Sequence, residues 1–448
     1  MQGKKAIQAN AYYSKNFDEI EYLDEGLFCI DSEGFIEKVL TKDDENYEKV
    51  RRRYASEGQL KVLEADQILL PGFVDLHIHA PQWAQSGTAL DRPLEIWLNE
   101  YTFPLEAKFE DQSFAANVYG EVVHTTLRNG TTSAVYFATV DRKSSLLLAE
   151  ICGEQGQRGF VGKVAMDDAS GCPEYYRDQD AQASIDETEA FIQSVLAIRN
   201  TYRQGVYPII TPRFIPTCTD ESLKGLGALA RKYDVHLQTH ASESDWAHHY
   251  VKEKMGENDV KALNRFGLLG PRAIIAHAPF LETEDQEIMV ETRTTIAHCP
   301  LSNAYFANSV LPVKDFMAKG ITIGLATDIS GGYTPSMYQA IRQAVISSKM
   351  LQDGVEPSRS KDLRGRAHAA LTLNNALFMA TVAGGQSLGL PLGKLEAGYI
   401  FDAQVVDTRE NIPRFYEEKH VEDLLHKVLL LSQTVNIKEV WVQGEQVI

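Results

Sequence analysis

Short apolar runs recur through the middle of the chain, and amphipathic segments separate most of them. The runs are rich in β-branched or aromatic residues and carry almost no charge before their ends, which is typical of strands buried on both faces. The pattern therefore predicts a set of parallel strands. Eight such runs lie at residues 69–79, 131–139, 159–166, 206–214, 235–242, 273–280, 294–303 and 321–328.

Segments of helical length lie between most of these predicted strands, for example at 111–130, 184–200 and 220–234. Eight strands that alternate with helices over about 260 residues match the size of a (β/α)8 barrel. The rival architecture, a doubly wound open sheet, usually has fewer strands and a glycine-rich first turn, and the sequence has neither feature. We therefore predict an α/β fold built on a (β/α)8 TIM-type barrel.

The two ends of the chain hold short strand-like runs of a different character, such as IFDAQVVD at 400–407 and EVWVQGEQVI at 439–448. Because termini often lie close together in folded domains, we predict that both ends build one small β-sandwich domain. Two unrelated extensions are the alternative. The predicted boundaries are 1–67 and 385–448 for this domain and 68–384 for the barrel.

Charge and composition narrow the classes of function. The chain has 44 Lys and Arg against 62 Asp and Glu, a formal net charge of −18. A nucleic-acid binder normally carries a basic face that neutralises phosphates, and no basic stripe occurs here. No stretch approaches the ~20 apolar residues that span a bilayer, and the N-terminus lacks the apolar run of a signal peptide. We therefore expect a cytoplasmic protein with neither a nucleic-acid nor a membrane partner.

The cysteines limit the kinds of metal site. The chain has five of them, an odd number, and no CxxC pair, which disfavours both a disulfide framework and a cysteine zinc site. A bound metal would therefore need imidazole and carboxylate ligands.

Histidines and one aspartate stand at the ends of four predicted strands: His77 and His79 on the first, His240 on the fifth, His277 on the sixth and Asp328 on the eighth. Active sites of (β/α)8 barrels are built at these strand ends. His77 and His79 are two residues apart, so both side chains point to the same side of their strand. Two such imidazoles are half of a tetrahedral zinc site, although an isolated pair can equally be ordinary polar residues. Together, the five residues predict a metal site.

These residues lie in strings that resemble the amidohydrolase superfamily. The resemblance spans the chain from about Pro71 to Asp328, and it implies a barrel, a divalent metal and hydrolysis at a carbon that bears nitrogen or another leaving group. The strings are PGFVDLHIH at 71–79, His240 with Glu243 three residues later, His277, Thr327 with Asp328, and GKLEAG at 393–398.

The resemblance also bears on the number of metal ions. Binuclear members of the superfamily place a lysine, carbamylated and bridging two metals, at the end of the fourth strand. Here that strand ends in Thr-Pro-Arg-Phe at 211–214. The resemblance therefore implies one metal per chain, expected to be zinc, as in the deaminase branch. His298, in the string HCPLSN at 298–303, also resembles that branch, and we expect it either to have a structural role or to support the metal ligands without binding the metal.

A finer resemblance is to the guanine deaminase family within that superfamily. It implies hydrolysis of guanine with water to xanthine and ammonia, by a homodimer. A related deaminase of another purine, pyrimidine or triazine ring is the alternative, and a non-catalytic scaffold is a further one. The strings are HIHAPQ at 77–82, WLNEYTFPLEAKF at 97–109, NGTTSAVYFAT at 129–139, TPRF at 211–214, HASE at 240–243, AHCPLSN at 297–303 and LATDISGGY at 325–333.

Deamination chemistry assigns roles to the two carboxylates. Zinc lowers the pKa of bound water from about 15.7 to about 7, which supplies a strong nucleophile at neutral pH. Glu243, not needed as a ligand, is the expected acid that protonates the ring nitrogen. Asp328 is the expected base as well as a ligand, since two carboxylates in different environments can hold opposite protonation states.

Three further side chains are expected to bind the ring. The planar donor fork of Arg213 matches the O6 and N7 acceptors of guanine, although a solvated or salt-bridged arginine is the alternative. Gln82 offers one donor and one acceptor to another ring edge. Phe214 is expected to cover the ring face, and core packing is an equally good interpretation. His248 and His249, in the helical stretch after the fifth strand, are expected to be exposed.

Overall fold

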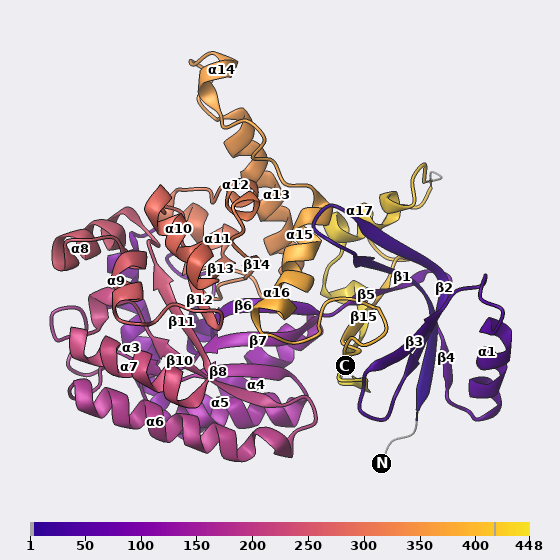
Figure 1. Ribbon diagram of the computed structural model, residues 1–448, viewed down its shortest axis with the longest axis horizontal. Helices are drawn as coiled ribbons and strands as arrows, with labels where there is room; N and C mark the ends of the chain where they lie inside the picture. The colour runs from indigo at the N-terminus through magenta and orange to yellow at the C-terminus, as the bar shows by residue number, and fades with distance from the viewer. Residues whose placement is uncertain (1–3, 416–417) are drawn as a thin grey trace.

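Two sheets organise the part of the chain that the computed structural model describes, residues 4–415 and 418–448 (Figure 1). The larger sheet has the order β14-β13-β12-β11-β10-β8-β7-β6, with the short β9 beside β10, and the neighbours in it run parallel. Its strands are β6 Phe73–His79, β7 Thr131–Phe137, β8 Arg158–Gly162, β9 Val164–Ala165, β10 Val206–Pro212, β11 His236–Ala241, β12 Ala273–His277, β13 Thr295–His298 and β14 Ile323–Leu325.

The first and last strands of this sheet are joined through the backbone that follows β14. The amide of Asp328 donates to the carbonyl of His77 at 2.9 Å, and the amide of His79 donates to the carbonyl of Ile329 at 2.6 Å. The buried carboxylate of Asp75 accepts from the amide of Thr327 at 3.0 Å. These bonds close the sheet at the end of the strands where the predicted site lies, and the predicted (β/α)8 barrel is confirmed.

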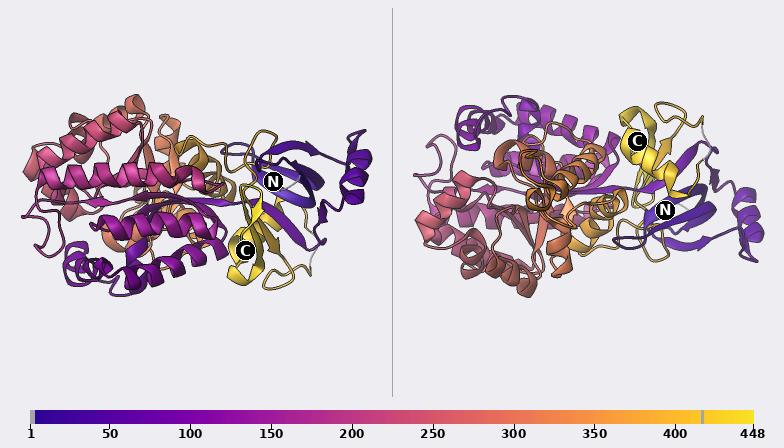
Figure 2. Two further views of the ribbon diagram at one scale, coloured as in Figure 1. Left: turned by 90° about the horizontal axis from the view of Figure 1, so that it is seen from below. Right: turned by 90° about the horizontal axis from the view of Figure 1, so that it is seen from above.

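Helices cover the outside of the barrel, and Figure 2 shows them on both sides of it. The helices predicted at 111–130, 184–200 and 220–234 are confirmed as α4, α6 and α7. Side-chain caps set their starts: Asp111, for example, accepts from two backbone amides in the first turn of α4. The helices are α1 Tyr47–Ser56, α2 Leu94–Trp97, α3 Phe103–Glu106, α4 Gln112–Arg128, α5 Arg142–Gln155, α6 Ala181–Ile198, α7 Asp220–Tyr233, α8 Asp245–Met255, α9 Asp259–Arg265, α10 Thr283–Thr292, α11 Pro300–Ser302, α12 Val313–Ala318, α13 Met337–Asp353, α14 Lys361–Arg364, α15 Leu373–Ala380, α16 Val382–Ser387 and α17 Glu422–Leu431.

The smaller sheet unites the two ends of the chain at one side of the barrel (Figures 1 and 2). Its central strand β5 pairs in parallel with β1 and antiparallel with β15, which binds N-terminal to C-terminal residues. A β domain from both termini is therefore confirmed, and its strands form one mixed sheet where the sequence predicts a sandwich. Its boundaries at 67/68 and 384/385 stay predictions. The strands are β1 Lys5–Ser14, β2 Ile20–Ile30, β3 Ile36–Leu40, β4 Leu60–Val62, β5 Gln67–Pro71, β15 Ala403–Asp407, β16 Ile437–Val442 and β17 Glu445–Gln446.

Among the helices of the described residues, none combines the length and the apolar character that a membrane span requires.

Candidate active site

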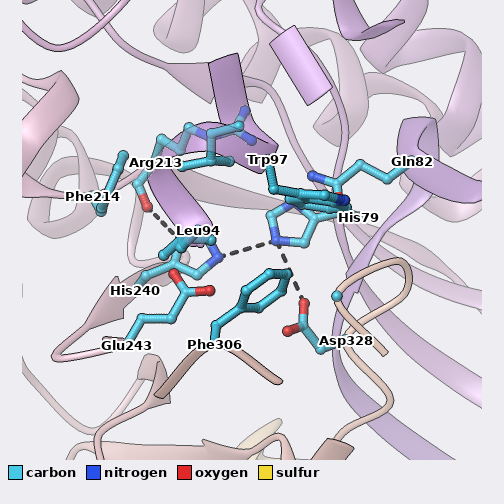
Figure 3. A pocket seen from close by; sticks show the side chains of 12 residues that line it. His79, Gln82, Leu94, Trp97, Arg213, Phe214, His240, Glu243, Phe306 and Asp328 are labelled. Carbon is cyan, nitrogen blue, oxygen red and sulfur yellow. Dashed lines mark hydrogen bonds and ion pairs between the residues drawn. The ribbon is translucent and has the colours of Figure 1, made fainter. Parts of the chain in front are cut away.

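The five predicted metal ligands meet at the C-terminal ends of the barrel strands, and all five are buried. One carboxylate oxygen of Asp328 lies 3.2 Å from Nε2 of His77 and 3.7 Å from Nε2 of His79. Its other oxygen lies 4.0 Å from Nε2 of His277. The Nε2 atoms of His79 and His240 are 3.0 Å apart (Figure 3). Four strands therefore bring their donor atoms into overlapping groups at one end of the barrel, where the sequence predicts the site.

The donor atoms fit a divalent metal ion. Nδ1 of His240 donates to the carbonyl of Arg213 at 2.6 Å, and Nδ1 of His277 donates to Oδ1 of Asn303 at 3.1 Å. These bonds fix both tautomers so that each Nε2 keeps a free lone pair, the usual arrangement around metal-binding histidines. Within the described residues, Nε2 of His77 and Nε2 of His277 are buried without a hydrogen-bond partner. Binding to a metal ion would satisfy both nitrogen atoms, and this set of nitrogen and oxygen ligands suits zinc.

Three of the four imidazoles are held in the neutral form that metal binding requires. Burial lowers the pKa of His79 and His240 well below the usual range, and it lowers the pKa of His277 to about 4. All three rings therefore carry lone pairs at neutral pH.

Cys299 lies beside this group, with its sulfur within 4.8 Å of ligand atoms of His77, His277 and Asp328. Burial raises the pKa of its thiol well above the usual value, and the thiol donates to the carbonyl of Ala297 at 3.4 Å. Cys299 therefore lines the site beside the five predicted ligands.

Two carboxylates at the site have opposite pKa shifts. Burial, reinforced by the charge of Asp328, raises the pKa of Glu243 to about 8. Burial also acts to raise the pKa of Asp328, but His77 and His277 outweigh it and bring that pKa below the usual value. An Oε1 of Glu243 lies 3.6 Å from Nε2 of His277. One carboxyl can therefore hold a proton at neutral pH while the other is ionised, as an acid–base pair requires.

The three predicted ring-binding residues line one pocket together with Glu243 and three of the predicted ligands (Figure 3). The pocket contains about 350 Å³ of empty space, some of it open to solvent. Aromatic and aliphatic walls with a few convergent polar groups are typical of sites for small planar ligands. Its lining residues are His79, Gln82, Leu94, Trp97, Leu98, Arg213, Phe214, His240, Glu243, Phe306, Asp328 and Gly331.

Glu106, at the end of α3, is a site residue that the sequence analysis missed. It is buried, and both of its oxygens accept from Arg213, Oε2 from Nη1 at 2.5 Å and Oε1 from Nη2 at 3.1 Å. The same Oε1 accepts from Nε2 of Gln82 at 2.8 Å. The salt-bridged alternative for Arg213 therefore holds, while its side chain still lines the pocket. The only signal in the sequence is the position of Glu106 within the string at 97–109.

Two histidines outside the ligand set give different outcomes. His248 is buried, and the prediction of exposure is wrong for it, whereas His249 is exposed as predicted. α8 turns Nδ1 of His248 to within 3.2 Å of the hydroxyl of Ser242, which donates to Asp259 at 3.1 Å. His298 is buried at the end of β13 and lies outside the potential ligand groups of the described residues, in line with a structural role.

The chain is similar in sequence and in structure to several known proteins. A profile of the amidohydrolase family matches residues 68–447. The chain is 35% identical to the guanine deaminase of Dictyostelium discoideum over 460 aligned positions, which cover 99% of this chain and 98% of that one. It is 37% identical to the guanine deaminase of Mus musculus, over 96% of this chain and 93% of that one. The crystal structure of guanine deaminase from C. acetobutylicum with bound guanine in the active site aligns with a TM-score of 0.88 and 31% identity, over 99% of this chain and 100% of that one.

Proposed function

The chain belongs to the amidohydrolase family and, within it, to the guanine deaminases, and we propose that it hydrolyses guanine to xanthine and ammonia with one zinc ion per chain. It is a hydrolytic deaminase. The observation that carries the choice of guanine is the shared pocket: the ring-edge donors of Arg213 and Gln82 line it together with the acid Glu243 and three strand-end metal ligands.

The metal would be held by the strand-end histidines and Asp328. When bound there, a zinc ion lowers the pKa of water and makes it a nucleophile at neutral pH. We assign the ligand set His77, His79, His240, His277 and Asp328, whose free lone pairs converge.

The two carboxylates move the protons. Asp328, ionised beside His77, accepts a proton as water attacks the ring carbon that bears the amino group. Glu243, protonated because of its raised pKa, donates to the adjacent ring nitrogen. Glu243, now ionised, takes the second proton of the water and gives it to the departing amino group, which leaves as ammonia. Transfer of the proton on Asp328 to Glu243 then restores the starting state. One guanine and one water thus give one xanthine and one ammonia.

The ring is held in the plane of the donors. Arg213 offers N–H groups to the O6 and N7 acceptors, and Gln82 contacts a second edge. Phe214 lies beside the pocket as a ring-covering face and also packs in an aromatic cluster with Trp97 and Phe103.

Ammonia release from guanine, compared with a panel of other purine, pyrimidine and triazine rings, tests the proposal. We expect guanine to give the highest kcat/KM. Faster turnover of another ring would favour the related-deaminase alternative, and no turnover of any ring by the zinc-loaded protein would favour the scaffold.

Elemental analysis tests the metal proposal separately. We expect about one zinc per chain, because no lysine occupies the end of the fourth barrel strand at 211–214. Two metal ions per chain would contradict the mononuclear assignment.

A homodimer is part of the same proposal. What supports it is an arm, made of the C-terminal end of α13 and the segment that contains α14, that projects from the barrel (Figure 1) and exposes Ile346, Met350, Val355 and Leu363. Exposed apolar side chains that cluster in this way mark interaction surfaces. Light scattering after size exclusion should give twice the 50.0 kDa of one chain, and Leu363→Glu should shift the mass toward that of the monomer.

We also place the protein in the cytoplasm. Its five cysteines are all free and buried, which suits a reducing compartment. Fluorescence of a tagged chain in its own cell type would test this placement.

A further inference from the structure

We propose that Glu106 is a specificity-determining positioning residue. It orients Arg213 and Gln82 toward the edge of the bound ring and neutralises the charge of Arg213. Glu106 hydrogen-bonds to both side chains and is itself fully buried, so it acts on a bound ring only through them. The inference rests on the proposed function, because it assumes that Arg213 and Gln82 contact the ring.

Glu106 fixes the orientation of the Arg213 side chain. Glu106 accepts from Nη1 and Nη2 of Arg213, so the end of the guanidinium fork is occupied by protein. Arg213 makes no other hydrogen bond through its side chain among the described residues, which leaves its remaining N–H groups for a ligand. The ring of Phe103 lies 5.0 Å from the guanidinium and supports its plane. The direction of the free donors is therefore set before any ring binds.

The same carboxylate fixes which way the amide of Gln82 points. A carboxylate accepts and cannot donate, so the NH₂ group of Gln82 faces Glu106. The amide oxygen of Gln82 accepts from the backbone N–H of Ser330 at 3.3 Å, which supports the same orientation. Gln82 therefore presents one defined pattern of donor and acceptor to the pocket, and a flipped amide would lose both contacts.

Glu106 also neutralises the charge of Arg213. The side chains of Arg213 and Glu106 are 3% and 0% exposed, so water screens neither charge, and the pair has no net charge. A site without net charge at this edge suits guanine, which is neutral. Xanthine loses a proton near neutral pH and becomes an anion. A lone buried Arg213 cation would attract that anion and slow its departure, and Glu106 prevents this attraction by cancelling the charge.

Two substitutions separate orientation from charge in the zinc-loaded enzyme. Glu106→Gln removes the charge and offers Arg213 an amide donor where it needs an acceptor. Glu106→Asp keeps the charge and shortens the reach. Glu100→Gln is the matched control, because Glu100 is exposed and belongs to the same segment. For each variant we would measure kcat and KM for guanine and the inhibition constant of xanthine, at a pH where xanthine is ionised.

We expect both substitutions to raise KM for guanine by roughly 10- to 100-fold, the effect of losing one charge-assisted hydrogen bond, with a smaller change in kcat. Only Glu106→Gln should lower the ratio of the xanthine inhibition constant to the KM for guanine, by about tenfold or more. Glu106→Asp and Glu100→Gln should keep the wild-type ratio. A structural role alone would lower the amount of folded enzyme and leave KM and this ratio unchanged, and that result would overturn the proposal.

If neither single variant folds, the double variant Glu106→Gln with Arg213→Gln removes both charges and leaves no lone buried ion. The proposal requires this double variant to bind guanine weakly and to keep the wild-type ratio; a ratio lowered tenfold would contradict it. A wild-type enzyme that releases no ammonia from guanine would end the proposed function instead. In that case KM of the same variants for whichever ring the panel identifies decides the role of Glu106.

Discussion

Two buried arginines, one near each end of the barrel strands, are each paired with a buried carboxylate. Arg158, at the start of β8, is paired with Asp402 and donates to Gln443 at 2.8 Å. It also donates to the hydroxyl of Ser133 at 2.9 Å and to the carbonyl of Gln204 at 3.1 Å. All three of its nitrogens have protein partners, and the contacts join the barrel to the terminal sheet.

Arg213, which follows β10 at the opposite end, is also paired with a carboxylate but uses fewer of its donors. Among the described residues, its side chain hydrogen-bonds to Glu106 alone, and it faces a pocket. A buried polar group without partners is costly, so a protein retains one where a ligand supplies the missing bonds. Burial and pairing of an arginine therefore do not define its role, because the number of donors that remain without a protein partner differs between the two.

The largest difference between the two ends of the barrel should come from removing a proposed metal ligand. His77→Ala should abolish ammonia release and bring bound zinc close to zero, because a strand-end nitrogen is lost from the site, while the Arg158 end stays intact. Elemental analysis together with the ammonia assay would measure this. A variant that keeps a full equivalent of zinc would remove His77 from the ligand set.

Glu243→Gln should leave zinc content and folding close to wild type while lowering kcat by about 10²- to 10⁴-fold, the range for loss of a general acid–base group. The amide keeps the shape of the side chain but cannot carry a proton. Because Glu243 serves two transfers, we expect the upper end of that range. Loss of zinc would instead make Glu243 a ligand or a support for one, and near wild-type turnover would mean that another group moves the protons.

Arg213→Ala should lower kcat/KM for guanine by roughly 10- to 1,000-fold, since one or two charge-assisted contacts are lost, each worth about 1.5–3 kcal/mol. The measurement is steady-state kinetics on folded, zinc-loaded enzyme. Unchanged kinetics would show that the donors left free at this end do not reach the ring.

Arg158→Met should have the smallest effect on catalysis, with kcat and KM of the folded enzyme unchanged. It should lower the free energy of unfolding by about 3–5 kcal/mol, because Asp402 is left buried without its partner. Chemical denaturation would give the stability and the ammonia assay the activity. A drop in kcat/KM without loss of stability would mean that the two arginines do not divide their roles as the comparison suggests.

The strands and the residues that meet at their ends were predictable because their signals are local. An apolar run marks a buried strand wherever it lies, and the two-residue spacing of His77 and His79 fixes their common side without reference to the rest of the chain. The strand-end positions of His240, His277 and Asp328 then follow from the rule that parallel strands end at one face.

The features of the site that the sequence did not predict depend on contacts between distant segments. Glu106 lies 107 positions from Arg213, and Asn303 lies 26 positions from His277. The burial of His248 likewise follows from its packing against Ser242 and Asp259. No periodicity or spacing in the sequence predicts these contacts, because they depend on which strands become neighbours in the fold.

The sequence by itself determined the barrel, the union of the two termini in one β domain, and the residue types that converge at the strand ends. Only the tertiary structure decided how those residues are used. It paired Arg213 with Glu106, gave Glu243 and Asp328 opposite pKa shifts, and anchored His277 on Asn303. The reason is physical: strand and helix patterns follow from neighbours along the chain, whereas burial, hydrogen-bond partners and local charge exist only once distant segments have packed together.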